Sequence, residues 1–301
     1  MIEQALQQHL QAQEALLPYL AKYADNMAIF NQEAPADSDE FWGDGPQYGR
    51  IVYAVDLQGD PERTLGGMLA VDILCKEDEQ FPEEIEPILR PLIHGYFFSN
   101  QKVVVSAQWK NTSYFTEPER KVTGCTVAFD LLAFPISTYA PHVITQFNEW
   151  SSGFENLLVI NRDQPPTAAW KPKDGKSAVY WRIAREEQCR WIPTTVSTVW
   201  MTATVKGYIF SETPAEAAEV ANRLKIRLYA DKRLKKDGLL LRAGESPIMV
   251  NRNITVDNGA DPLRTGQVTL EATYGVVIHI EPDAEKIQHY QLYLKGETYG
   301  K

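Results

Sequence analysis

The side chains that most often catalyse reactions or bind metals are scattered along this sequence. No histidine pairs with another at the i,i+4 spacing that would place two imidazoles on one helix face as metal ligands. The five histidines are His9, His94, His142, His279 and His289. There is no G-x-S-x-G elbow, no P-loop and no dinucleotide-binding fingerprint, and for Asp130 and His279 packing is the favoured interpretation. We therefore expect no catalytic residue, no metal and no cofactor.

Two acidic clusters, at residues 33–40 and 77–86, offer carboxylates to a cation. Neither shows the alternating oxygen-ligand spacing of a calcium-binding loop, which favours a solvated surface. The glycine pair Gly66-Gly67 stands alone and is more typical of a β-bulge than of a phosphate-binding loop.

The most distinctive charge feature is a basic segment in the second half of the chain. It comprises Arg223, Lys225, Arg227, Lys232, Arg233, Lys235, Lys236 and Arg242. Three interpretations remain open, in this order of preference: a solvated helix face, a contact to an acidic protein surface, and a contact to nucleic-acid phosphates. The chain as a whole is acidic and carries no recognition signature for nucleic acids, so we expect no specific nucleic-acid binding.

A loop whose skeleton occurs twice is a second candidate site. Residues 29–45 (IFNQEAPADSDEFWGDG) and 159–175 (VINRDQPPTAAWKPKDG) align without a gap, matching at an Asn, an acidic residue, a Pro and an Asp-Gly. Each copy follows apolar β-formers, contains a tryptophan and ends in an Asp-Gly turn signal. We predict interaction sites in both loops, at Glu33, Asp37, Asp39, Glu40, Trp42, Trp170, Lys171 and Lys173.

The elements that position the first loop follow from periodicity and composition. In chain order they are an amphipathic helix at 2–17, strands at 49–57 and 65–75, a helix opened by Pro82, and strands at 103–109 and 122–134. Pro87 and Pro91 should kink or break the second helix. The last two strands bracket a predicted turn region, SYFTEPER, at residues 113–120.

The second half repeats this order. It predicts a helix at 141–150, strands at 177–184 and 196–210, a helix opened by Pro214, and strands at 248–256 and 268–280. Thr213 and Glu216 form a capping box at the start of the second helix. The offset between matching positions grows along the chain from 130 to 132 to 144 residues. One ancestral unit with local insertions would give this pattern.

The predicted fold class is therefore α+β, with two tandem copies of a helix-strand-strand-helix-strand-strand module. Each module has a mainly antiparallel sheet flanked by helices. We place the first module at residues 1–137, the second at 138–281 and a C-terminal extension at 282–301. A frayed polar tail is favoured for the extension over a segment that docks on a partner.

Composition is that of a soluble globular protein, with 44% hydrophobic and 23% charged residues in 301. Residues 1–140 carry 21 acidic and 9 basic side chains, whereas residues 141–301 carry 19 and 21. This asymmetry favours head-to-tail contact between unlike faces. Three dispersed cysteines argue against a disulfide framework, and we expect neither a signal peptide nor a membrane span.

The order of elements resembles the tail-terminator or tail-completion proteins of long-tailed bacteriophages. The resemblance rests on the helix at 2–17, the proline loop and strand pair at 35–75, the helix at Pro82, and the hairpin ending in TVAFDLLAF at 126–134. It covers residues 1–135 best, and it reaches the second module through the internal match. Proteins of that family are single α+β modules that assemble as rings capping the tail tube.

The resemblance implies a structural protein of the virion tail, assembled in the host cytoplasm, with no enzymatic activity. Its expected partners are further copies of itself, the tail tube, the neck or connector, and in some phages the sheath. Because this chain is two modules long, both six chains and three chains per ring remain open. Another neck or baseplate component, and an enzyme with an unrecognised site, are the alternatives.

Overall fold

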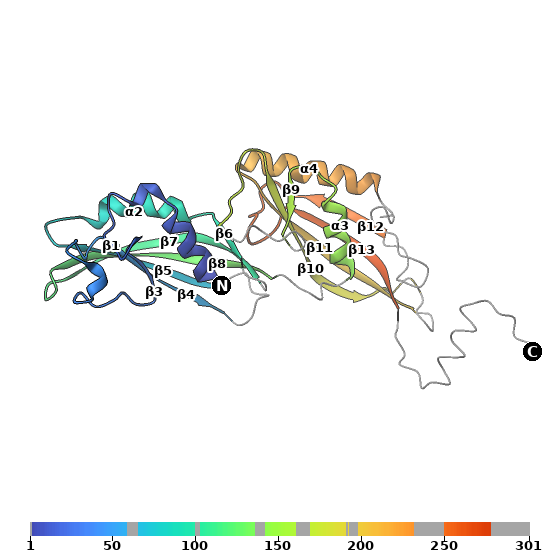
Figure 1. Ribbon diagram of the computed structural model, residues 1–301. Helices are drawn as coiled ribbons and strands as arrows, with labels where there is room; N and C mark the ends of the chain where they lie inside the picture. Colours follow the sequence, from blue (N-terminus) through green and yellow to red (C-terminus); the bar gives the residue numbers. More distant parts are fainter. Residues whose placement is uncertain are drawn as a thin grey trace, which may run out of the picture.

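The computed structural model describes residues 2–58, 66–99, 103–135, 142–160, 169–190, 192, 198–231 and 250–277. The chain is mixed α+β, and strands contain more of these residues than helices do. It forms two lobes that lie side by side, the first from residues 2–135 and the second from residues 142–277 (Figure 1). Each lobe is built on one large sheet.

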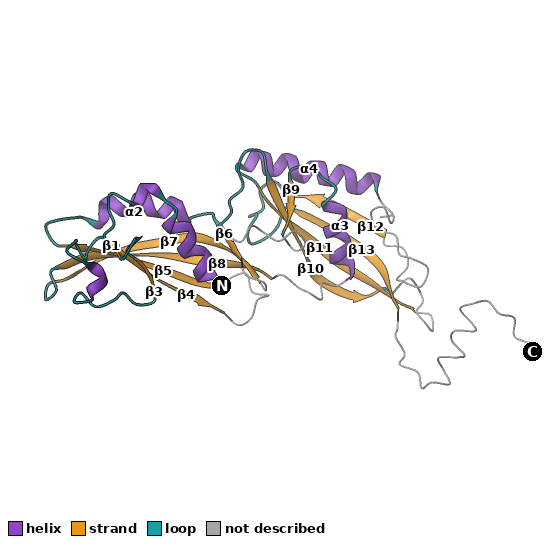
Figure 2. Ribbon diagram, viewed as in Figure 1, coloured by secondary structure: helices purple, strands orange, loops and turns teal. Residues whose placement is uncertain are grey.

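Six strands form the sheet of the first lobe, in the order β3-β4-β5-β8-β7-β6. Its strands pair antiparallel except for β3 and β4. Helices α1 and α2 cover one face (Figure 2), where Leu6, Leu89 and Phe129 share one buried core. The elements are α1 (Ile2–Gln11), the 3₁₀ helix η1 (Glu14–Leu16), β1 (Lys22–Tyr23), β2 (Asn26–Met27), β3 (Ile29–Asn31), the 3₁₀ helix η2 (Glu40–Trp42), β4 (Arg50–Leu57), β5 (Gly67–Lys76), α2 (Pro82–Ile93), β6 (Phe97–Ser99), β7 (Val103–Glu117) and β8 (Val122–Pro135).

Five strands form the sheet of the second lobe, in the order β12-β13-β11-β10-β9. Only β9 and β10 pair in parallel among them. Helices α3 and α4 pack on one face, and Phe147, Trp181 and Leu224 lie in the core between them and the sheet. The elements are α3 (His142–Ser151), β9 (Leu157–Val159), β10 (Ser177–Gln188), β11 (Thr198–Phe210), α4 (Pro214–Ala230), β12 (Val250–Val256) and β13 (Val268–Val277).

Local sequence accounts for several of these elements. Along β5, burial alternates with period two, because successive side chains of a strand point to opposite faces. Helix α4 begins at the predicted capping box: Oγ1 of Thr213 accepts a hydrogen bond from the Glu216 backbone N–H at 3.2 Å, and the Glu216 carboxylate accepts one from the Thr213 N–H at 3.4 Å. These bonds satisfy two N–H groups that the helix itself leaves without partners.

The first helix is shorter than the sequence predicts. Helix α1 ends at Gln11 rather than Leu17, and η1 follows. The side chain of Gln13 donates to the carbonyl of His9 at 2.9 Å, while the Gln13 backbone N–H bonds to Leu10 at 3.1 Å. The side chain thus replaces the bond that an α-helix would make to His9, and the backbone tightens to a 3₁₀ turn.

Helix α2 continues from Pro82 to Ile93 through both internal prolines, where the sequence predicts a kink or break. Pro87 and Pro91 lie four residues apart and both are exposed. The carbonyls that lose a helical N–H partner therefore lie on the solvent side, where water can bond to them. The buried face, with Ile85, is unaffected.

The hairpin of β7 and β8 is longer than predicted. Residues 113–117 were assigned to a turn, but they pair with residues 126–122 of β8, and the turn begins at Pro118. Tyr114, Phe115 and Thr116 are strong β-formers that pair with β8, so the strand continues up to the turn that Pro118 signals.

The glycine pair is not a bulge, because Gly67 pairs in register with Leu57 on one side and with Leu131 on the other. A Cβ on Gly67 would overlap the carbonyl of Asp56, and one on Gly66 would overlap the side chain of Ala133. Glycine is required here for close approach of the backbone.

Candidate interaction surfaces

The first repeated loop is anchored by a buried tryptophan. Trp42 is packed with Ala21 and Ala28, and its ring lies 5.0 Å from Tyr23 and 5.7 Å from Phe30, measured between ring centroids. Its indole N–H donates to the carbonyl of Ala36 at 3.0 Å. Trp42 therefore holds the loop in place instead of presenting a surface to a partner.

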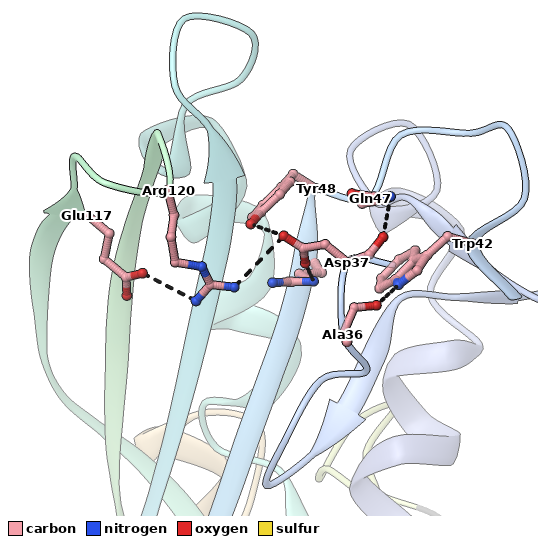
Figure 3. A network of polar contacts seen from close by, with 8 residues as sticks. Ala36, Asp37, Trp42, Gln47, Tyr48, Glu117 and Arg120 are labelled. Atoms are coloured by element: carbon pink, nitrogen blue, oxygen red, sulfur yellow. Dashed lines mark hydrogen bonds and ion pairs between the residues drawn. The ribbon is translucent and has the colours of Figure 1, made fainter. Parts of the chain in front are cut away.

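The centre of this loop is an ion pair between Asp37 and a buried arginine (Figure 3). Arg50 is only 2% exposed, and its Nη1 donates to the Asp37 carboxylate at 2.9 Å. Oη of Tyr48 donates to the same carboxylate at 2.9 Å, and the Tyr48 ring centroid lies 4.5 Å from the Arg50 guanidinium. Arg120 on the β7–β8 turn reaches Asp37 at 4.0 Å and Glu117 at 3.4 Å. The network ties the loop to β4 and to the tip of the hairpin.

The other acidic residues of this loop lie nearer the solvent. Asp39 caps η2, because its Oδ1 accepts from the backbone N–H of Phe41 at 3.0 Å. Glu33 and Glu40 are exposed. Of the predicted acidic set, only Asp37 therefore belongs to a network that joins three parts of the lobe.

The state of Asp37 makes the stability of the first lobe depend on pH. Burial by itself raises the pKa of Asp37, but hydrogen bonds from Tyr48 and Arg50 and the charges of Arg50 and Arg120 outweigh it, so the pKa lies below its ordinary value. A depressed pKa means that this carboxyl is protonated less readily in the folded state than in the unfolded chain. The contribution of ionised Asp37 to the free energy of unfolding is thus complete above the ordinary pKa of about 3.9. It is lost as the pH falls through the pKa of Asp37 in the folded state.

We expect the difference in free energy of unfolding between the natural chain and an Asp37→Asn variant to be constant from about pH 5 to 7 and to shrink below about pH 4. Urea unfolding across this range measures it. An Asp39→Asn variant is the control, because that side chain caps a single 3₁₀ turn. A difference that stays constant into strong acid would contradict the assignment.

The second repeated loop has a different role. Residues 161–168 lie outside the described part, so its Asn, Asp and Pro are not placed. Beyond them, Trp170 pairs with Phe97 of β6: their backbones exchange hydrogen bonds of 2.6 and 2.9 Å, and the ring centroids are 5.4 Å apart. Lys171 donates to the carbonyl of His94 at 3.4 Å, and Lys173 is exposed in a tight turn. This loop therefore extends the edge of the other lobe's sheet.

The lobes meet through the faces of the two sheets that the helices leave uncovered. Along β10, Val179 and Trp181 point into the core under the helices, so Ala178 and Tyr180 point the opposite way. One buried cluster fills the junction, formed by Phe97, Val104, Leu132 and Phe134 of the first lobe and Ile160, Ala178, Tyr180, Tyr208 and Phe210 of the second. The Phe134 ring lies 5.1 Å from that of Phe210 and 5.4 Å from that of Tyr180.

A cleft of about 270 Å³ lies beside the junction, at the start of α4. Part of its polar lining is hydrogen-bonded within the protein: Ser106 accepts from the Gln108 amide at 2.8 Å, and Glu212 accepts from the backbone N–H of Asp174 at 3.2 Å. The described residues that line it include no histidine and no cysteine.

The basic segment is only partly described. Arg223, Lys225 and Arg227 lie on α4, whereas Lys232, Arg233, Lys235, Lys236 and Arg242 lie outside the described residues. Arg223 and Arg227 are exposed, and Arg227 pairs with Asp231 at 3.7 Å. Between them Ile226 is 67% exposed, and Tyr229 one turn further on is 47% exposed. We call Arg223, Ile226, Arg227 and Tyr229 the α4 ridge.

A second exposed surface, which the sequence did not indicate, lies on β7 beside α2. Trp109 is 41% and Tyr114 is 52% exposed, and we call this pair the aromatic edge. The Arg90 guanidinium lies 4.8 Å from the Trp109 ring centroid and 3.4 Å from the Glu86 carboxylate. Burial first, then the nearby groups of Cys125, Glu86 and Glu83, raise the pKa of Tyr114. The signal was hidden because Tyr114 was assigned to a turn.

The backbone of β7 is also open along the aromatic edge. Strand β6 pairs with residues 104–106 only. The residues that directly precede β6 form further hydrogen bonds to β7 as far as Trp109. From Asn111 to Glu117, no strand in the described ranges pairs with β7 on the side away from β8. An open edge of this length can accept a partner.

The remaining reactive side chains have structural surroundings. Cys75, Cys125 and Cys189 are free and buried, and burial raises the pKa of Cys75 and of Cys125 to about 12. His9 bonds to the carbonyl of Leu92 at 2.7 Å, and His94 accepts from the backbone N–H of Trp109 at 3.0 Å.

Within the described ranges, no group of three or more His, Cys, Asp and Glu side chains is arranged to hold a metal ion. No helix in the same part of the chain has the length and apolar character needed to cross a membrane.

Comparison with protein-family models, with curated proteins and with solved structures found no match to this chain.

Proposed function

We propose that this chain is a structural assembly protein of a long-tailed bacteriophage. It forms a ring at the head-proximal end of the tail, terminates growth of the tail tube and joins the neck. Its partners are further copies of itself, the tail tube, the neck or connector, and the sheath where one exists. It acts in the virion tail after assembly in the host cytoplasm, and it catalyses no reaction.

A tandem duplication is part of this proposal, with modules at residues 1–137 and 138–281 and an extension at 282–301. It is supported by strand order: β3-β4-β5-β8-β7 and β9-β10-β11-β13-β12 follow the same order along the chain. Each sheet starts with a parallel edge pair, each lobe begins with a helix, and each inserts another helix after its third strand of this set. A duplicated α+β module gives this agreement.

The main support for the proposed function is this shared order of elements, because it resembles the order of elements in tail-terminator proteins. A chain with two related but unlike lobes can contact its neighbour through different surfaces on its two ends. Such a heterologous contact closes into a ring when its rotation allows. The exposed edge of β7 and the exposed apolar residues of α4 are surfaces of the kind that such an assembly uses.

Native mass spectrometry and electron microscopy of the purified full chain test the proposal. We expect closed rings of six chains, or of three chains that supply six modules, together with binding to one end of tail tubes. A stable monomer at micromolar concentration would rule out the ring. Copurification with a baseplate instead of the tube end would assign the protein to another part of the tail.

A further inference from the structure

We propose that the ring contact joins the aromatic edge of one copy to the α4 ridge of the next copy. This inference rests on the proposed function and deepens it, because it assigns the surfaces through which identical chains assemble. The aromatic edge is Trp109 and Tyr114 beside α2, and the α4 ridge is Arg223, Ile226, Arg227 and Tyr229.

Both surfaces expose large apolar side chains that the described part of the chain leaves uncovered. In a folded protein an isolated exposed apolar residue needs no explanation, but paired ones on adjacent turns or along one strand form a patch. Ile226 and Tyr229 are three residues apart, so they lie on one face of α4. Trp109 and Tyr114 lie along β7 and both flank α2, since Arg90 lies over Trp109 and the charges of Glu83 and Glu86 act on Tyr114.

The charges without an ion-pair partner among the described residues differ in sign between the two lobes: Glu83 and Glu84 lie on α2, and Arg223 lies on α4. Near the aromatic edge, the charges of Glu83 and Glu86 of α2 act on Tyr114, Arg90 lies over Trp109, and Glu117 at the end of β7 pairs with Arg120. Glu86 pairs with Arg90, whereas Glu83 and Glu84 are exposed and have no ion-pair partner among the described residues. Around the α4 ridge, Arg223 and Arg227 flank Ile226. Complementary charges of this kind steer association and suppress contact between like surfaces.

The two patches must meet between copies. They lie on different lobes, with α4 along the second lobe and the far end of β7 directed away from it (Figure 1). One copy therefore presents an acidic aromatic surface at one end and a basic apolar surface at the other. Because the surfaces differ, each contact leaves a free surface of each kind, and assembly continues until the ring closes.

The two patches also occupy similar positions relative to the helix and strand beside them. Tyr229 donates to the carbonyl of Ile254 at 3.0 Å, so the α4 ridge borders β12, as the aromatic edge on β7 borders α2. Both patches thus sit where a helix meets the outermost long strand of its sheet. Aromatic and arginine side chains at the centre of a contact contribute most of its binding energy.

Two single variants of the full chain, Tyr114→Asp and Ile226→Asp, test the contact. Both positions are exposed, so we expect each variant to keep its fold by circular dichroism and to lose ring formation, with association weakened about tenfold or more. Leu17→Asp, at an exposed apolar residue that belongs to neither patch, is the matched control and should form rings like the natural chain.

Mixing the two variants separates this contact from others. Each variant keeps one intact surface, so a mixture should give dimers of one copy of each and no larger species. A charge exchange provides a second measurement: Arg223→Glu with Arg227→Glu should weaken assembly, and adding Glu83→Lys with Glu84→Lys should restore it.

If both aspartate variants form rings as the natural chain does, the assignment of these two surfaces is wrong, but the proposed function is not contradicted. Variants that lose assembly but form no mixed dimer would also overturn the assignment, since the contact would then not join these two unlike patches. A natural chain that stays monomeric would overturn both proposals.

Discussion

Replacing Phe134 by alanine is expected to lower the free energy of unfolding by about 3–5 kcal/mol and to uncouple the two lobes. Phe134 is 3% exposed and its ring contacts those of Phe97, Tyr180, Tyr208 and Phe210. Its removal leaves a cavity in a buried cluster that both lobes share, which costs the lost transfer free energy and the lost packing contacts.

Calorimetry of the full chain measures both effects. Each lobe has its own core, so we expect the variant to unfold in two separate thermal transitions. In the natural chain we expect the unfolding of the two lobes to be more closely coupled. Phe41→Ala is the control, because Phe41 is an exposed phenylalanine in the same lobe and its loss should cost below about 1 kcal/mol. A Phe134→Ala chain as stable as this control would show that the junction contributes nothing.

Replacing Asp37 by asparagine is expected to lower the free energy of unfolding by about 2–3 kcal/mol at neutral pH. Removing one partner of a buried ion pair costs about 3–5 kcal/mol, because it leaves a buried charge uncompensated. We expect less here, since the Asp37 side chain is 40% exposed while that of Arg50 is 3% exposed. The cost falls mainly on the Arg50 guanidinium, which stays buried between aromatic rings.

A double variant distinguishes a buried charge from a general defect of the loop. Asp37→Asn with Arg50→Met removes both charges and should be more stable than Asp37→Asn alone. Glu117→Gln, which removes an exposed ion pair with Arg120, should change stability by less than about 0.5 kcal/mol. Urea unfolding of the four chains is the measurement, and a double variant less stable than the single one would refute the assignment.

Local features of the sequence were sufficient for most elements. The capping box at Thr213, the alternation along β5 and the β-branched runs act over a few residues, so they can be recognised without knowing the fold. The match between the two halves also follows from local signals in a fixed order. The misassignment of residues 113–117 arose because a distant partner decided the outcome: they become strand because β8 pairs with them.

The duplicated loop shows the limit of pattern matching. Trp42 and Trp170 lie two positions apart in the aligned motif, and their surroundings differ: Trp42 is buried in its own lobe, whereas Trp170 pairs with Phe97 of the other lobe. A motif specifies the shape of a loop, but what the loop touches depends on which elements lie next to it. The run of apolar residues at 178–181 was a usable sign of the junction, because a strand buried on both faces is apolar without alternation.

By itself the sequence indicated most of the longer helices and strands and their order along the chain, because capping, turn chemistry and periodicity are properties of neighbouring residues. Only the tertiary structure decided which faces and edges stay open, because exposure depends on contacts between residues far apart in the chain. Burial of Arg50 beside Asp37, the aromatic junction at Phe134 and the exposure of Tyr114 all belong to this second class. Of the residues proposed to join one copy to the next, Arg223 and Arg227 already belonged to the predicted basic segment, whereas the exposure of Trp109, Tyr114, Ile226 and Tyr229 was visible only in the structure.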